Sequence, residues 1–336
     1  MFEIITSYLT DRYQITKINS TVSEIRKVHF GVPQGSILGP LLFILYINDI
    51  TNVNNDANFF LFADDTAITL SAKSHAELQR KIDNVLPSIS EWFFANRLSL
   101  NTKKTMYQVY SKRKHENFDV QINGSKIERQ ESVKYLGVMV DENLKWKKHI
   151  YNISSVVNRN LGIMGRAKYF LSSRELLLLY NTLILPYLNY CAVVWGRNYT
   201  STLKALVKFQ KRAVRIIDKK PFRYPTGMLF KKYKILKFPD IVKEQSIMIL
   251  LSFINRTLPK TIADMFQYSR PTNTRLLKHF FVPLVRTNYR KFALSYFAPK
   301  TWNKTICPLF SDIDDVPKNK ATLKKYIRKF LIDRYC

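Results

Sequence analysis

The chain has 336 residues, enough for one large domain or two ordinary domains with cores of their own. A hydrophobic content of 46% excludes a disordered tail, and three widely spaced cysteines exclude a disulfide framework and offer no CxxC zinc motif. The formal charge of +29 favours an anionic partner, either nucleic acid or an anionic membrane surface.

Nearly all of the basic excess lies in the second part of the chain. Residues 1–140 hold 16 Lys and Arg against 14 Asp and Glu, whereas residues 141–336 hold 38 against 11. Two interpretations of this distribution stay open, a track for phosphate backbones and an ordinary solvated surface.

No segment is predicted to span a membrane. Residues 37–47 are apolar but about half as long as a bilayer requires, and Gly39 and Pro40 interrupt them. The N-terminus has an acid at Glu3 and no basic region, unlike a signal peptide. We therefore expect an intracellular protein.

The first elements in chain order are a turn, an apolar helix and a hairpin. Residues 22–30 are predicted to be extended and to lead into a turn at Gly31–Gly35. Ser36 is expected to cap a helix that ends near Asn48 and is buried on most sides. Residues 58–70 predict a β-hairpin with the turn at residues 63–65.

A long amphipathic helix is predicted next, and Pro87 within it predicts a kink or a break. Its apolar stripe consists of Leu78, Ile82, Val85, Leu86, Ile89, Trp92 and Phe93. Short strands follow near residues 105–110, 118–122 and 133–140, with Asn123–Gly124 as a hairpin turn.

Beyond residue 145 the pattern becomes helical. The predicted helices cover residues 146–169, 173–186, 200–218, 240–256 and 320–335. The segment from Pro221 to Pro225 predicts a linker.

The acidic residues of the first part are unusually placed. Between Lys27 and Lys73 the only Asp, Glu, Lys or Arg residues are Asp49, Asp56, Asp64 and Asp65. Carboxylates in an apolar segment must be solvated, protonated or neutralised by cations. Two adjacent aspartates are common in turns, but they also suit Mg²⁺, which takes one or two carboxylates plus phosphates and water. Both interpretations stay open.

Two motifs carry a resemblance to a known family. GVPQGSILGP at residues 31–40, followed about thirty residues later by FADD at residues 62–65, resembles the palm of reverse transcriptases. The likeness is closest to non-LTR, LINE-type retrotransposons of the jockey-like group. Further similar segments are SYLTDRYQ (7–14), LLFILYINDI (41–50), LSLNTKKT (98–105), VKYLGVMVD (133–141), LPYLNYCAVVWG (185–196), KALVKFQKRAVRII (204–217) and RTNYRKFALSYFAPKTWN (286–303).

The resemblance implies an α+β fold in three parts. Residues 1–141 would form an incomplete reverse transcriptase palm, an antiparallel sheet with helices. Residues 142–220 would form a helical thumb, and residues 221–336 a basic, mainly helical C-terminal region. The implied reaction is two-metal nucleotidyl transfer with Mg²⁺ or Mn²⁺, and the implied partners are an RNA template, a DNA primer and deoxynucleoside triphosphates.

The resemblance also implies roles for single residues. Asp64 matches the carboxylate that binds both metal ions, and Asp65 matches its less direct neighbour. Lys104 matches the lysine proposed to protonate the pyrophosphate, although a plain solvated lysine would look the same. The residues implied to bind template and nucleotide are Gly31, Pro33, Gln34, Gly35, Phe62 and Ala63. Phe62 and Ala63 could equally be core residues.

Further roles fall later in the chain. Tyr135, Leu136 and Gly137 match the primer grip, and plain strand residues are the alternative. The candidates for the nucleic-acid backbone are Lys208, Lys211, Arg212 and Arg215, with Phe209 nearby for stacking. A solvated helix face is the alternative for this group.

The family places another metal-binding aspartate upstream, on a strand that reads roughly Phe-x-Asp. The chain starts thirty residues before Gly31, and the neighbours of Asp11 match a different element. We therefore expect a truncated copy that performs no primer extension alone. Three hypotheses stay open: part of a polymerase, a non-catalytic RNA- or DNA-binding remnant, and a product without a role.

Overall fold

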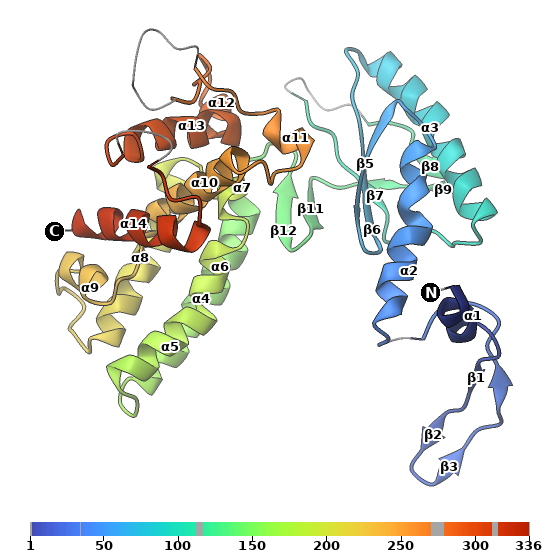
Figure 1. Cartoon of the computed structure of the whole chain (residues 1–336), viewed down its shortest axis with the longest axis horizontal. Coiled ribbons are helices and arrows are strands. Elements are labelled where there is room, and N and C mark those ends of the chain that lie inside the picture. The colour runs from blue at the N-terminus through green and yellow to red at the C-terminus, as the bar shows by residue number, and fades with distance from the viewer. Residues whose placement is uncertain (1, 34, 112–116, 270–278, 311–314, 336) are drawn as a thin grey trace. The chain divides into compact units, whose positions relative to one another are not determined.

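The computed structural model describes residues 2–33, 35–111, 117–269, 279–310 and 315–335. The chain divides into two compact units, Met1–Gln130 and Glu131–Cys336. The expected mixture of α and β structure is present, with small sheets in the first unit and a mostly helical second unit (Figure 1).

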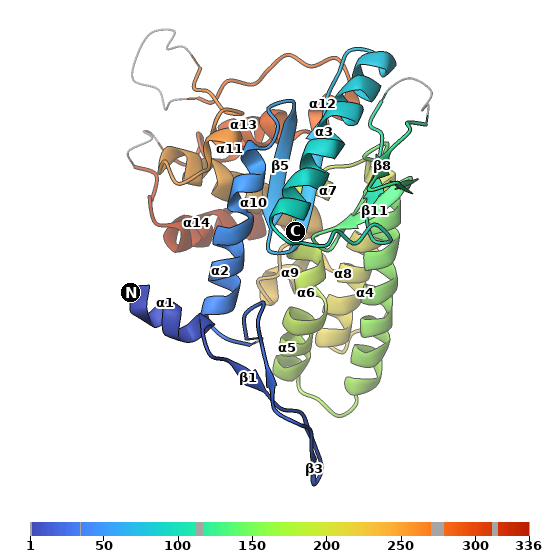
Figure 2. The ribbon, with the colours of Figure 1, turned by 90° about the vertical axis from the view of Figure 1, so that its right-hand side faces the viewer.

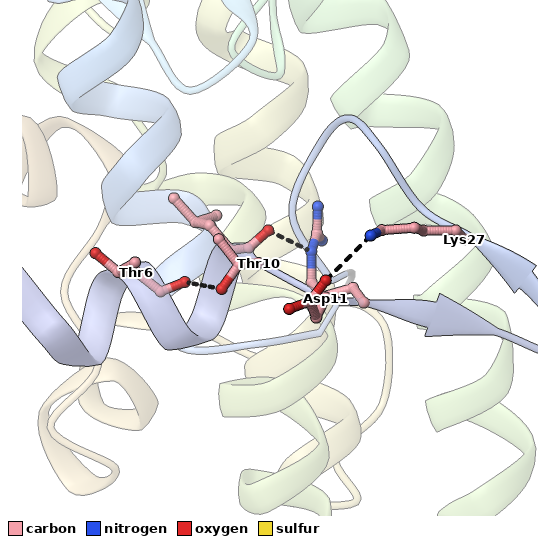
Figure 3. Close-up of polar contacts among 6 residues, drawn as sticks. Thr6, Thr10, Asp11 and Lys27 are labelled. Atoms are coloured by element: carbon pink, nitrogen blue, oxygen red, sulfur yellow. Dashed lines mark hydrogen bonds and ion pairs between the residues drawn. The ribbon is translucent and has the colours of Figure 1, made fainter.

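The first unit begins with helix α1 (Phe2–Leu9) and a solvent-exposed β-ribbon. The ribbon consists of two antiparallel pairs, β1 (Tyr13–Gln14) with β4 (Arg26–Lys27) and β2 (Lys17–Ile18) with β3 (Thr21–Val22). At its base, Lys27 forms an ion pair with Asp11 at 3.0 Å (Figure 3). The Thr10 hydroxyl donates to the Thr6 carbonyl at 2.8 Å and closes the end of α1 (Figure 3). The carboxylate of Asp11 thus has a structural partner in the ribbon.

The apolar helix α2 (Leu38–Ile47) continues into a short 3-10 helix, η1 (Asn48–Asn52). The N-cap of α2 is Ile37, not the expected Ser36, and it makes no side-chain capping bond; the Ser36 hydroxyl, one residue earlier, accepts a hydrogen bond from the Gly39 backbone N–H at 3.1 Å. The expectation that α2 is buried on most sides is wrong. Its buried residues are Gly39 and Ile47, and more than half of the surface of Leu41, Ile44 and Leu45 is exposed. The reason is that the other elements of this unit cover only part of the helix surface.

The predicted hairpin is confirmed as β5 (Ala57–Phe62) and β6 (Asp65–Leu70). Phe62 pairs with Asp65, so the turn has two residues, Ala63 and Asp64. Ala63 has a φ of 49°, the left-handed conformation that tight hairpin turns require.

Helix α3 (His75–Ala95) confirms the predicted amphipathic helix, but the break allowed at Pro87 is absent. The Ser74 hydroxyl caps the helix by accepting from the Glu77 backbone N–H at 3.3 Å. Pro87 lies on the exposed face, while Val85 and Ile89 beside it are buried. Packing of the apolar face therefore holds the helix together past the missing backbone hydrogen bond.

Short strands complete the first unit. They are β7 (Met106–Tyr107), β8 (Gln121–Ile122), β9 (Ser125–Lys126) and β10 (Glu128–Arg129). Asn123 and Gly124 form the predicted turn between β8 and β9, both with positive φ. β10 pairs in parallel with β7. These strands and α3 enclose a small core of Ile82, Phe118, Val120, Ile122 and Ile127.

The second unit opens with a hairpin, β11 (Ser132–Tyr135) and β12 (Val138–Asp141), and continues as helices. The longer ones are α4 (Lys147–Ala167), α5 (Ser173–Leu183), α8 (Thr200–Ile217), α10 (Phe238–Ile254), α13 (Leu294–Thr305) and α14 (Lys320–Asp333). The shorter ones are α6 (Leu185–Asn189), α7 (Ala192–Trp195), α9 (Gly227–Lys232), α11 (Lys260–Ala263) and α12 (Asn288–Phe292). The five predicted helices are confirmed, with α5 and α6 dividing one of them; α13, which contains Pro299, was not predicted.

Helix α10 is the centre of the second unit. It packs against α6, α7 and α8, which precede it in the chain, and against α13 and α14, which follow it. One continuous cluster of buried side chains runs from Val138 to Tyr335. A division of the basic part at residue 220 stays a prediction.

A buried polar network crosses this core. Gln210 donates to the Tyr180 hydroxyl at 3.0 Å and accepts from the Phe238 backbone N–H at 2.7 Å. The Tyr335 hydroxyl donates to Asp240 at 2.6 Å, which joins the end of the chain to α10. In the part of the chain that the structure describes, no helix combines the length and apolarity of a membrane span.

Candidate metal and nucleic-acid site

The turn between β5 and β6 presents two carboxylates to solvent. Asp64 is the second residue of the turn, and Asp65 is the first residue of β6. Both are exposed, and neither carboxylate pairs with the side chain of another residue that the structure describes. Asp56, by contrast, forms an ion pair with Lys81 at 3.3 Å. The hairpin therefore holds Asp64 and Asp65 as an adjacent pair that a cation can reach.

The residues before this pair are also exposed. β5 alternates between half-buried and exposed side chains, and Phe60 and Phe62 lie on the exposed side. Ala63 is exposed at the turn. The structure thus brings Phe62, Ala63, Asp64 and Asp65 together on one solvent-facing tip.

The loop before α2 has a backbone that glycine makes possible. Gly31 and Gly35 have φ values of 78° and 82°, which other residues adopt only with strain. Arg12 donates to the Gly31 carbonyl at 2.6 Å, and the Ser36 hydroxyl donates to the Pro33 carbonyl at 2.8 Å. Pro33 is exposed, and Gln34 lies outside the described residues. The loop is therefore held in place while most of its surface stays accessible.

The loop and the carboxylate tip belong to neighbouring elements of the first unit. Figures 1 and 2 both show α2 alongside the β5–β6 hairpin, with the loop leading into the start of α2. Lys104 is on a separate turn, where its backbone N–H donates to the Asn101 side chain at 3.2 Å. The Lys104 side chain is exposed, so both interpretations of this residue, a proton donor and a plain solvated lysine, stay open.

The donor set fits part of a divalent-cation site. Asp64 and Asp65 supply carboxylate oxygens, the ligands that Mg²⁺ and Mn²⁺ prefer. Among the residues described, no group of three or more His, Cys, Asp or Glu side chains could hold a metal ion. The pair would therefore need further ligands, such as phosphates, water or another carboxylate.

In the second unit, the turn of the β11–β12 hairpin is held by a tyrosine. Leu136 and Gly137 have positive φ values of 44° and 81°. The Tyr190 hydroxyl donates to the Leu136 carbonyl at 2.6 Å. A Cβ atom on Gly137 would lie 3.3 Å from the Tyr190 ring. Glycine is therefore needed at position 137 both for its conformation and for the approach of this ring.

Two further contacts tie the same hairpin to α4. The Met139 backbone N–H donates to His149 Nδ1 at 3.3 Å, and Asp141 accepts from the Trp146 backbone N–H at 2.6 Å. Tyr135 is half-buried beside the turn. Sequence reasoning missed Tyr190 and His149, because neither belongs to a local pattern that points to the hairpin.

The four basic residues proposed on α8 share the face opposite its buried stripe. Lys208, Lys211 and Arg212 are exposed, whereas Arg215 is half-buried and donates to the Tyr224 carbonyl at 2.8 Å. Arg212 also donates to Asn158 of α4 at 3.2 Å. Phe209 packs partly buried against the core and is not placed for stacking.

Several acidic residues of this unit are used internally. Asp218 is held by Lys232 and Tyr233, Asp240 by Lys243, and Glu244 by Arg328. Their side chains are only 6%, 12% and 4% exposed, so little of their negative charge reaches the surface. Each of these ion pairs is neutral, so the positive charge of this unit comes from its other Lys and Arg residues.

Comparison with known proteins now decides the family. Residues 1–140 match the family model described as reverse transcriptase (RNA-dependent DNA polymerase). Residues 1–140 therefore form a reverse transcriptase domain. The matched residues include the glycine loop, the carboxylate tip and Lys104.

The similar curated proteins come from mobile elements. One is a probable RNA-directed DNA polymerase from transposon X-element of Drosophila melanogaster, 27% identical over 64% of this chain and 25% of that protein. Another is the RNA-directed DNA polymerase from mobile element jockey of the same species, 26% identical over 71% of this chain and 27% of that protein. The jockey polymerase of Drosophila funebris is 25% identical over 73% of this chain and 28% of that protein.

The chain spans about a quarter of the length of these relatives. No solved structure matches it. The reverse transcriptase domain at residues 1–140 and the segments after it are thus related to the polymerases of the jockey and X-element non-LTR retrotransposons.

Proposed function

We propose that this chain is the metal-binding palm segment, with the following thumb and basic region, of an RNA-directed DNA polymerase from a non-LTR retrotransposon. One observation supports this most directly. The two solvent-facing carboxylates, Asp64 and Asp65, occupy a tight hairpin tip within the residues that match the reverse transcriptase family. The proposed template is RNA, the proposed primer DNA, and the proposed substrates deoxynucleoside triphosphates.

Each part of the proposed site has its own task. Asp64 and Asp65 would hold Mg²⁺ or Mn²⁺, which when bound supplies activation of the primer hydroxyl and neutralisation of the phosphates. The loop from Gly31 to Gly35 would let the backbone approach the template and the incoming nucleotide closely. Lys104 would donate a proton to the departing pyrophosphate. The turn from Tyr135 to Gly137 would press on the primer end.

The isolated chain is expected to perform no primer extension. Two carboxylates on one turn provide only part of the ligands for a fixed pair of metal ions, and Mg²⁺ would bind to them weakly. Mg²⁺-dependent extension by the purified chain that is lost in Asp64→Asn would contradict this expectation while supporting the polymerase assignment. Loss of extension in Asp64→Asn but not in Asp56→Asn would exclude a general effect of charge.

A second candidate function is binding of RNA or DNA without chemistry. The excess of 38 Lys and Arg over 11 Asp and Glu in residues 141–336 favours it, because a strongly cationic chain attracts phosphate backbones. Salt-sensitive RNA binding that is unchanged in Asp64→Asn and weakened in the combined Lys208→Gln and Lys211→Gln variant would support this candidate.

A further inference from the structure

One end of the helical bundle in the second unit displays aromatic rings without covering them. The segment that follows α4 carries Tyr169 and Phe170, which are 75% and 89% exposed. The segment that follows α8 carries Phe222, which is 80% exposed. A surface on which several exposed rings gather marks a binding site, whereas a single exposed ring such as Tyr151 of α4 is ordinary.

The two segments lie at the same end of the bundle. α5 packs against α8, and Figure 1 shows both segments at the end away from the β11–β12 hairpin. The pKa of Glu175, near the start of α5, is lowered by its hydrogen bonds to Ser172 and by the charge of Lys219 just beyond α8. The three rings are therefore carried at one end of the bundle, which we call the aromatic end face.

Ordered turns present the rings. The Phe170 backbone N–H donates to the Ala167 carbonyl at 3.0 Å, and the Tyr224 backbone N–H donates to the Pro221 carbonyl at 3.1 Å. Arg215 Nε also donates to the Tyr224 carbonyl at 2.8 Å. A ligand that stacks on these rings would therefore cost little conformational entropy in the protein.

Basic side chains surround the rings. Lys168 lies 4.9 Å from the centre of the Tyr169 ring, and Arg215 lies 5.7 Å from that of Phe222. Lys219 and Arg223 are exposed beside them. The nearby acids are Glu175, used in the capping box of α5, and Asp218, whose side chain is 6% exposed. Cations thus prevail on this face.

We infer that the aromatic end face binds single-stranded nucleic acid, with bases stacked on Phe170 and Phe222 and phosphates near Lys219 and Arg223. Unpaired bases expose the flat faces that aromatic rings stack on, whereas a duplex hides them inside its stack. This inference rests on the proposed nucleic-acid function but names a surface separate from the carboxylate tip and from the basic face of α8. RNA and DNA single strands share the chemistry that the face recognises.

The test measures binding of the full chain to a fluorescent single-stranded RNA, the same DNA sequence and the corresponding RNA duplex. The combined Phe170→Ala and Phe222→Ala variant is expected to bind both single strands about tenfold more weakly for each ring removed. Its duplex affinity should not change. Tyr151→Ala, which removes a 71% exposed ring from α4, is the matched control and should bind like the parent chain. Preference for RNA over DNA would identify the strand that the face accepts.

Two further measurements keep the inference testable if the double variant is unstable. Phe222→Trp should show fluorescence quenching with a single strand and none with a duplex. For single-strand binding, the logarithm of the association constant falls linearly with the logarithm of the salt concentration. The combined Lys219→Gln and Arg223→Gln variant should make this slope shallower by about 0.7 for each phosphate that the protein no longer neutralises.

The outcomes separate this inference from the proposed function. Unchanged single-strand affinity in the double variant, with normal nucleic-acid binding otherwise, overturns the inference alone. Failure of the parent chain to bind any nucleic acid overturns both. Binding of the parent chain to anionic phospholipid vesicles, abolished in the double variant while RNA binding persists, would identify the face as membrane-binding and overturn the inference.

Discussion

Helix α2 of the first unit and helix α10 of the second are both rich in leucine and isoleucine, but their surroundings are opposite. Helices that precede and follow α10 in the chain cover it, and its residues Ile247, Leu250 and Leu251 are fully buried. α2 leaves Ile44 and Leu45 more than half exposed. A helix that is apolar on all sides needs partners on all sides, and only the second unit supplies them among the residues described.

The comparison teaches where the stability of each unit comes from. In the second unit, one core cluster extends over nearly the whole sequence, so the removal of one side chain is felt across several helices. In the first unit, the core cluster consists of a few side chains between α3 and the short strands. The first unit should therefore unfold with a smaller and more gradual transition than the second.

The largest effect is expected at the centre of the second unit. Phe238 is fully buried at the start of α10 and stacks on Trp195 with ring centroids 5.1 Å apart. Phe238→Ala should lower the free energy of unfolding of this unit by about 3–5 kcal/mol, because it leaves a cavity in a close-packed core. Denaturant unfolding followed by circular dichroism measures this. A decrease below about 1 kcal/mol would show that the core is not the cooperative cluster described.

The next effect concerns the hairpin turn held by Tyr190. Gly137→Ala places a methyl group at a φ of 81° and 3.3 Å from the Tyr190 ring, so it should destabilise by about 1–3 kcal/mol. Gly162→Ala is the matched control, because a Cβ there meets nothing within 4 Å. In the middle of α4 it should stabilise by about 0.5–1 kcal/mol. Equal effects of the two substitutions in thermal melts would contradict the described turn.

A pH effect should also distinguish the two units. Burial lowers the pKa of His149 from its ordinary value of 6.5, so the unfolded chain binds this proton more readily than the folded one. The stability of the second unit should therefore be intact above pH 6.5 and fall below it, by at most about 1.4 kcal/mol per pH unit. His149→Gln should flatten this slope below pH 6.5. If the variant loses stability with falling pH as steeply as the parent chain, titratable groups other than His149 cause the loss.

Local sequence patterns predicted the helices and hairpins well, but they did not predict which distant residues contact them. The turns at Ala63–Asp64 and Asn123–Gly124 follow from short-range chemistry, so the hairpins were predictable. The hydrogen bond from Tyr190 to Leu136 joins residues 54 positions apart, and no periodicity reveals such a pair. The burial of α2 was predicted wrongly for the same reason, since burial depends on distant elements.

The candidate site shows the same limit. The adjacent carboxylates and the glycines of the loop were visible as motifs, and their exposure follows from the geometry of the turns. The aromatic end face was not visible, because Phe170 and Phe222 follow different helices, and only the packing of α4 and α5 against α8 places their segments at the same end of the bundle. Sequence motifs therefore predict which reactive side chains are neighbours in the chain, whereas the surfaces formed by distant segments depend on packing.

The smallest effect is expected on α2. Ile44→Gln and Leu45→Gln replace side chains that are more than half exposed, so each should change the stability of the first unit by less than about 0.5 kcal/mol. Ile47→Gln is the control, because Ile47 is 4% exposed on the same helix, and it should destabilise by several times as much. If Leu45→Gln were as damaging as Ile47→Gln, the outer face of α2 would be covered in solution. In that case α2 and α10 would both be covered, and they would differ only in what covers them.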